Sequence, residues 1–248
     1  MKIGIIGVGH IGKTLAIKLA SAGHNVSVAN SKSPDEMNSD VLATGAKAVT
    51  AQEVVMDKDV IILSIPLNRI PDNAPLFASV PEQVTVIDTS NYYPARDQKI
   101  DSIEAGMVES LWVVQQLGRP IAKAWNAIGS QSLEKNGMDV SSDRRIAIPF
   151  ATDRDADVQV TRTLIQDTGF DAYYTGSLAD SWRQQPGAPV YCTDLTAAEI
   201  EMHVDKAEKE RLPARRDLAV AAIMERLSSS TANPDVDFGL RLSRALYM

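Results

Sequence analysis

The chain has 248 residues, 44% of them hydrophobic and 23% charged, which suits one large globular domain or one and a half. Its net charge of −7 argues against nucleic acid or a membrane surface as the main partner, and its most apolar stretch, residues 60–65, is far too short to span a bilayer. One cysteine excludes an internal disulfide, and with three scattered histidines it predicts no metal site; we expect a cytoplasmic protein without a leader.

The chain opens with the order strand, glycine turn, helix, strand. Residues 1–6 are a short apolar run, residues 13–22 have helical periodicity, and residues 25–29 alternate as a second strand. A GxGxxG turn joins the first strand to the helix and consists of Gly7, Val8, Gly9, His10, Ile11 and Gly12. Its first glycine permits a tight turn, its second lets the backbone approach a pyrophosphate, and its third lets helix and strand pack closely. The pattern predicts a dinucleotide whose phosphates lie at the N-terminus of the helix.

The tip of the second strand indicates which dinucleotide binds. NAD-binding proteins place Asp or Glu there to accept hydrogen bonds from the ribose, whereas this chain has Asn30, Ser31 and Lys32, and its first acid is Asp35. A carboxylate at the tip would repel a 2′-phosphate, while an amide, a hydroxyl and an ammonium group would hold it. We therefore predict NADP(H) as the cofactor, although the same residues would also suit a solvated polar turn.

Strands and helices continue to alternate as far as residue 174. The expected strands are residues 46–49, 59–65, 83–88, 120–124, 144–150 and 169–174. The expected helices are residues 34–43, a helix after the capping box at 50–53, a helix before Pro81, residues 105–117 and residues 155–168. The alternation predicts an α/β fold with a Rossmann-type doubly wound parallel sheet.

From Leu195 onward the pattern becomes helical, so we expect a small C-terminal helical extension. We divide the chain into an NADP-binding Rossmann domain, residues 1–150, and a C-terminal strand and helix region, residues 151–248. The second region is expected to complete the acceptor site and to form the contact of a homodimer.

Ligands of such sheets bind beyond the carboxyl ends of the strands, so the residues that follow the strands are candidate contacts. Those expected on the nicotinamide side are Ser64, Ile65, Pro66, Asn91, Asn126 and Ala127. Pro, Ser and Asn are also ordinary turn residues, so each of these positions has a purely structural alternative. In a later loop, Trp182 and Arg183 could hold a flat anionic substrate, or could be a hydrophobic anchor and a helix-end charge.

No acid–base pair stands out, and the catalytic residues are left open. His10 lies in the glycine turn, His24 follows a helix, and His203 lies on a charged helix. Reduction at a carbonyl needs a proton shuttle at the oxygen. Hydride transfer between a nicotinamide and a flavin-like ring needs mainly two rings held face to face. The absence of a visible pair therefore favours ring-to-ring transfer.

With these motifs, the chain resembles the NADPH:coenzyme F-420 oxidoreductase family, which also includes the reductase domain of STEAP metalloreductases. The resemblance rests on KIGIIGVGHIGKTLAIKLASAGHNVSVANSK, VIILSIP, VIDTSNYYP, KAWNAIG and GSLADSWRQQPGAPVY. It implies that Ser31 and Lys32 bind the 2′-phosphate, and that Pro66, Asn126 and Ala127 contact the nicotinamide side. Lys32 stands where the family has Arg, and Ala127 stands where many relatives have Thr.

The preferred hypothesis is an oxidoreductase that transfers a hydride between NADP(H) and a small-molecule acceptor of flavin or deazaflavin type, such as F-420, FMN or FAD. One alternative is an NADPH-dependent reductase of a small imine or carbonyl compound, for which the helical tail is short. Another is a non-catalytic NADP(H) sensor, which would bind the cofactor but oxidise it with no acceptor.

Overall fold

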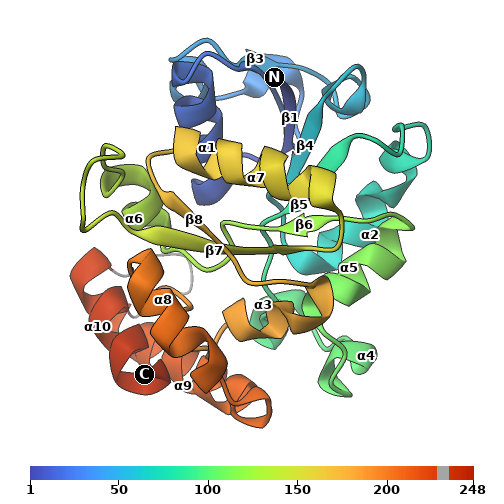
Figure 1. Ribbon diagram of the computed structural model, residues 1–248. Helices are drawn as coiled ribbons and strands as arrows, with labels where there is room; N and C mark the ends of the chain where they lie inside the picture. Colours follow the sequence, from blue (N-terminus) through green and yellow to red (C-terminus); the bar gives the residue numbers. More distant parts are fainter. Residues whose placement is uncertain (228–234) are drawn as a thin grey trace.

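The computed structural model describes residues 1–227 and 235–248. In this part of the chain, eight strands form one sheet in the order β3-β2-β1-β4-β5-β6-β7-β8 (Figure 1). The strands are β1 (Lys2–Ile6), β2 (Asn25–Ala29), β3 (Lys47–Ala48), β4 (Val60–Leu63), β5 (Thr85–Asp88), β6 (Ala122–Lys123), β7 (Ala147–Thr152) and β8 (Asp171–Tyr174). The predicted Rossmann-type α/β fold is confirmed, and the strand order reverses between β1 and β4.

Helices of very different length connect and extend these strands. The α-helices are α1 (His10–Ser21), α2 (Ile70–Asn73), α3 (Pro94–Asp97), α4 (Asp101–Glu104), α5 (Glu109–Leu117), α6 (Ser130–Lys135), α7 (Asp155–Asp167), α8 (Ala197–His203), α9 (Leu212–Leu227) and α10 (Val236–Tyr247). None of the helices described is long and apolar enough to cross a membrane.

The sheet is the middle of three layers (Figure 1). On one face, Leu15 of α1 and Leu164 of α7 join Ile62 of β4 in one buried cluster. On the other face, Trp112 of α5 joins Ile61 of β4 in a second cluster. Adjacent residues of β4 thus point to opposite faces, and because both faces are covered this strand is wholly apolar.

The sheet is mostly rather than wholly parallel, because β7 runs antiparallel to β6. Ala122 lies opposite Thr152, so β7 begins at the edge of the sheet where β6 ends. The hydrophobic pattern of a buried strand is the same in either direction, and therefore the sequence did not reveal this reversal.

Three predicted helices are shorter in the structure. Residues 34–43 form two 3-10 turns, Pro34–Glu36 and Ser39–Leu42, because Met37 between them is extended and buries its side chain. The capping box at Thr50 and Glu53 forms, but a single 3-10 turn follows it. In the region 105–117, Gly106 has a φ of +97° and interrupts the helix, so α5 begins at Glu109.

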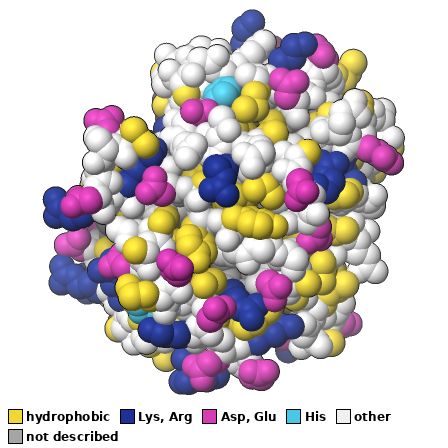
Figure 2. All heavy atoms as spheres, in the orientation of Figure 1, with side chains coloured by type: hydrophobic (Ala, Val, Ile, Leu, Met, Phe, Trp, Pro, Cys, Tyr) yellow, Lys and Arg dark blue, Asp and Glu magenta, His cyan; other side chains and the backbone are white. Residues whose placement is uncertain are grey.

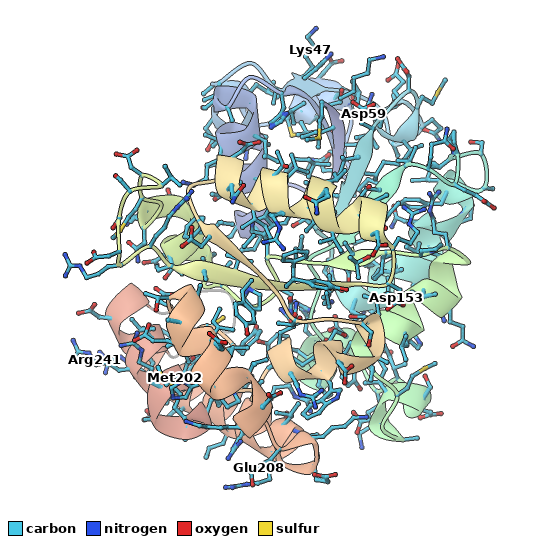
Figure 3. The ribbon with its side chains drawn as sticks, viewed as in Figure 1. Lys47, Asp59, Asp153, Met202, Glu208 and Arg241 are labelled. Atoms are coloured by element: carbon cyan, nitrogen blue, oxygen red, sulfur yellow. The ribbon has the colours of Figure 1, made fainter. Side chains whose placement is uncertain are left out.

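The C-terminal helices α8, α9 and α10 lie beyond the carboxyl ends of the central strands. Figure 3 shows Met202 of α8 and the neighbouring Glu208 at the opposite end of the molecule from Lys47 and Asp59, which stand at the starts of β3 and β4. Figure 2 shows acidic and basic side chains interspersed over the visible face, without an extended area of one sign. The division at residue 150 and the homodimer contact stay predictions.

Candidate functional site

The glycine turn has the backbone geometry that its sequence predicts. Gly7 has a φ of +96°, which favours glycine, and a Cβ added to Gly12 would stand 2.0 Å from the Gly7 carbonyl oxygen. A Cβ added to Gly9 would instead meet no atom within 4 Å. The first and third glycines are therefore required by packing, whereas the second faces open space, as a position that a pyrophosphate approaches should.

A cavity of about 840 Å³ opens at the switch in strand order. The predicted site residues that line it are Gly9, His10, Ile11, Ser64, Ile65, Pro66, Asn91 and Asn126. They come from the turn after β1, the N-terminus of α1 and the exits of β4, β5 and β6, so the structure brings these separate segments together. Gly7, Val8 and Gly12 lie in the same turn but outside the cavity lining. This volume is in the range of cofactor and small-molecule sites.

The tip of β2 lies outside this cavity. This is expected of residues that would bind the adenosine end of a dinucleotide, far from its nicotinamide ring. The Asn30 side-chain oxygen accepts a hydrogen bond of 2.8 Å from the Lys32 backbone N–H, which folds the tip into a tight turn. Ser31 and Lys32 are exposed, and none of the ion pairs found among the described residues uses Lys32. Next to this turn, the Glu36 carboxylate accepts a hydrogen bond of 3.3 Å from the Ser33 backbone N–H. The tip thus leaves an ammonium and a hydroxyl group free for a phosphate.

An amide cluster fixes the exits of β5 and β6 against each other. The Asn91 amide donates to the Asn126 carbonyl oxygen at 2.8 Å, and the Asn126 amide donates to the Asn91 side chain at 3.1 Å. The Asn126 amide also donates to the Gln184 carbonyl at 2.8 Å. Both predicted contacts lie at the cavity, but bonds to each other and to Gln184 already use most of their polar groups. Ala127 lies outside the lining and packs in an apolar cluster with the C-terminal helices.

A buried ion pair lies directly beneath the β5 exit. Lys123 and Asp88 are fully buried, with the ammonium nitrogen 2.6 Å from the carboxylate. The same ammonium donates to the Ser90 carbonyl oxygen at 2.5 Å, and the other Asp88 oxygen accepts the Ser90 N–H at 3.0 Å. The ion pair therefore binds both the carbonyl oxygen and the N–H of Ser90, a residue that lines the cavity.

Glu109, at the start of α5, is a second buried acid in this region. It is 4% exposed and accepts the Tyr92 N–H at 3.1 Å. Burial raises the pKa of Glu109 to about 7, and the charges of Lys123 and Arg216 oppose the rise only in part. The Glu109 carboxyl group therefore gains or loses its proton close to neutral pH.

The cavity wall opposite the glycine turn is aromatic, and the sequence did not predict it. The hydroxyl groups of Tyr93 and Tyr191 are 2.7 Å apart, and Tyr247 stands edge-on to Tyr191 at 6.4 Å between ring centroids. All three line the cavity, together with Cys192, whose thiol has a pKa that burial raises to about 12. Tyr93 follows the predicted Asn91 by two residues, so a longer strand exit would have included it. No local sequence feature identifies Tyr191 or Tyr247 as part of this wall.

Helices α9 and α10 close the cavity. Their lining residues are mostly apolar and are Arg216, Ala219, Val220, Ile223, Met224, Gly239, Leu240, Leu242, Ser243 and Tyr247. The helical extension was expected to complete the acceptor site; its residues line the cavity, and the acceptor itself stays a prediction. Arg216 is the cation of this wall; its guanidinium lies over the Tyr92 ring at 5.4 Å and bonds to Asp217 at 2.8 Å.

Trp182 and Arg183 do not line the cavity. Trp182 packs beside the apolar cluster beneath the C-terminal helices, and Arg183 stacks on its ring at 4.4 Å. The Arg183 guanidinium is paired with Asp180 at 2.6 Å and with Asp205 at 3.5 Å. The structure thus favours the anchor and helix-end charge over the substrate contact. Among the residues described, no group of three His, Cys, Asp or Glu side chains is placed to hold a metal ion.

Comparison with known proteins agrees with this geometry. Residues 2–92 match the model of the family described as NADP oxidoreductase, coenzyme F420-dependent. The protein YjhV of Escherichia coli strain K12 is 50% identical over 66 residues, which are 27% of this chain and 48% of that protein. The chain therefore spans about half the length of this curated relative.

Two solved structures have the same fold over most of the chain. The hypothetical protein SMa0349 of Sinorhizobium meliloti is 25% identical with a TM-score of 0.68, covering 79% of this chain and 95% of its own. A candidate F420-dependent NADP reductase of Arthrobacter sp. FB24 is 14% identical with a TM-score of 0.60, covering 93% and 96%. The resemblance found in the sequence is therefore confirmed over residues 2–92, the segment that matches the family described as NADP oxidoreductase, coenzyme F420-dependent.

Proposed function

We propose that this protein is an oxidoreductase that transfers a hydride between NADP(H) and a flavin or deazaflavin acceptor. The observation that carries the proposal is that one continuous cavity joins the glycine turn to the helical extension. One end exposes the N-terminus of α1, and the other is closed by apolar side chains of α9 and α10. Such a cavity can hold two flat ring systems in contact, which is the main requirement of hydride exchange between rings.

The residues at the first end fit NADP(H). The open space over Gly9 admits the pyrophosphate, and α1 has no acid in its first turn that would repel it. Ser31 and Lys32 offer a hydroxyl and an ammonium group to the 2′-phosphate, with the carboxylate of an NAD site absent from this tip. NADPH, when bound, supplies the hydride; the chain's own groups orient it and, through α9 and α10, exclude water.

The cofactor assignment is tested by Lys32→Asp. Losing a charged hydrogen bond and adding a repelling charge should weaken NADPH binding by about 1–3 kcal/mol, or roughly five-fold to a hundred-fold in Kd, without weakening NADH binding, since Asp at this tip can accept a hydrogen bond from the ribose. Lys47→Asp is the matched control, because it makes the same charge change at the start of β3 (Figure 3). Calorimetry that finds equal NADPH affinity in both variants contradicts the assignment of the phosphate site.

The acceptor is tested by following NADPH oxidation at 340 nm. Turnover with F-420, FMN or FAD is expected. Turnover confined to small imines or carbonyl compounds would favour the alternative reductase. NADPH binding without oxidation by any acceptor would favour the sensor.

A further inference from the structure

A pair of tyrosine hydroxyl groups lines the cavity and lies outside the glycine turn and the β2 tip, the segments assigned to the dinucleotide. Tyr93 follows β5 and Tyr191 stands 98 residues later, yet their oxygens are 2.7 Å apart. Two hydroxyl groups have two hydrogens, and their mutual bond uses one. The other neighbour of Tyr191 is the Cys192 thiol, which is a weak hydrogen-bond acceptor. One of the two hydroxyl hydrogens is therefore held by no more than a weak thiol contact, and it can be donated to a molecule in the cavity.

Tyr93 is held in place by buried polar groups. Its backbone N–H donates to the Asp97 carboxylate at 2.9 Å, and Asp97 is 3% exposed. The same carboxylate is paired with Arg96 at 2.8 Å, and the Arg96 guanidinium lies over the Tyr93 ring at 5.4 Å. Arg96 also donates to the Asn91 carbonyl oxygen at 2.7 Å. The Tyr93 ring therefore has one position, set from two sides.

Tyr191 is held by a strained loop. Cys192 and Asp194, which follow it, have φ values of 53° and 49°, and Trp125 on the facing β6 exit has a φ of 55°. All three line the cavity. The Cys192 N–H donates to the Ala127 carbonyl at 2.9 Å, which ties this loop to the β6 exit. Left-handed conformations of non-glycine residues cost free energy and concentrate at functional sites, so their gathering here points to a positioned group.

We propose that the Tyr93–Tyr191 pair donates the hydrogen bond, and where required the proton, to the acceptor atom that gains charge when the acceptor is reduced. This role rests on the proposed function and deepens it. When a hydride bonds to the electrophilic atom of the acceptor, the electron pair of the broken π bond moves to a carbonyl oxygen or a ring nitrogen. The hydroxyl hydrogen that is not used within the pair forms a hydrogen bond to that atom. On full proton transfer, an O–H bond of the pair breaks, and the phenolate then takes a proton from water.

Both phenols are present as donors over the physiological range. Burial raises the pKa of Tyr93 and of Tyr191 above the ordinary value of 10. A neutral phenol can protonate an alkoxide fully, whereas towards a reduced ring nitrogen it acts as a hydrogen-bond donor. The acceptor class is therefore one with a polar atom conjugated to the site of hydride addition.

The experiment uses the full chain with Tyr93→Phe, Tyr191→Phe and the double variant. Tyr173→Phe is the matched control, because its ring lies outside the cavity lining. The probes are NADPH, F-420, FMN and FAD, with binding measured by fluorescence and oxidation of NADPH measured in H₂O and D₂O. Far-UV circular dichroism and Tm establish that each variant is folded.

We expect NADPH affinity to be unchanged in all variants. In the double variant, the affinity for the acceptor that wild type reduces should fall about tenfold and kcat about a hundredfold, with loss of the solvent isotope effect. Wild-type acceptor affinity, kcat and isotope effect in a folded double variant would overturn this role while leaving the proposed function intact. A wild-type protein that neither binds nor reduces F-420, FMN or FAD would overturn the proposed function, and this role with it.

Discussion

Glu109 makes the stability of this protein depend on pH near neutrality. Its folded pKa of about 7, raised by burial, compares with an ordinary value of 4.5, and this gap corresponds to about 3 kcal/mol. Between these two values the folded protein keeps a proton that the unfolded chain has released. Stability therefore falls as the pH rises from about 4.5 to 7, and the loss is complete above that range.

Glu109→Gln isolates this effect. The amide oxygen can still accept the Tyr92 N–H, but it has no proton to release. Urea unfolding at pH 5 and pH 8 should show wild type losing about 3 kcal/mol more than the variant over this interval. Glu104→Gln is the control, since that exposed carboxylate bonds to the hydroxyl group of the same tyrosine at 2.8 Å. Parallel pH dependences in wild type and Glu109→Gln would refute the buried-acid argument.

Two further predictions concern the residues that shape the cavity. Gly12→Ala should lower Tm and weaken NADPH binding at least tenfold, because its Cβ would stand 2.0 Å from the Gly7 carbonyl oxygen. Gly9→Ala should leave Tm unchanged and weaken only NADPH binding. Equal Tm in the two variants would contradict this prediction. Lys123→Met should destabilise the fold by about 3–5 kcal/mol in urea unfolding, since it leaves the buried Asp88 carboxylate unpaired. Restoration of most of this loss by Asp88→Asn in the Lys123→Met background is the check, and no restoration would show that packing rather than charge is responsible.

The part of the site that the sequence predicted is the part that local geometry determines. The glycine turn, α1 and β2 are contiguous, and the close contact at Gly12 is made within six residues of Gly7. The polar tip at Ser31 and Lys32 follows from the same unit. Strand existence was likewise predictable, because buried strands such as β4 are wholly apolar. Their exact ends were not, since pairing with neighbours sets them.

The rest of the site depends on contacts between distant segments. Tyr93 and Tyr191 meet over 98 residues, and the Asn126 amide bonds to Gln184 over 58. Trp182 illustrates the converse: its sequence context left both a substrate contact and a hydrophobic anchor open, and tertiary packing places it against an apolar cluster. No periodicity or spacing in the chain records such meetings, because they follow from the sheet order and from how the C-terminal helices close over it.

The two halves of the cavity therefore differ in how far a family resemblance extends to them. The matched segment, residues 2–92, contains the glycine turn, the β2 tip and the β4 exit, so it covers the dinucleotide half. The half proposed for the acceptor is built mostly from residues beyond that segment, including Tyr93, Tyr191 and Arg216. Because hydride transfer needs only a second ring in contact with the first, changes in α9 and α10 could alter the acceptor and leave the cofactor site intact. Under the proposed function, we therefore expect the C-terminal helices and the tyrosine pair to determine which acceptor is reduced.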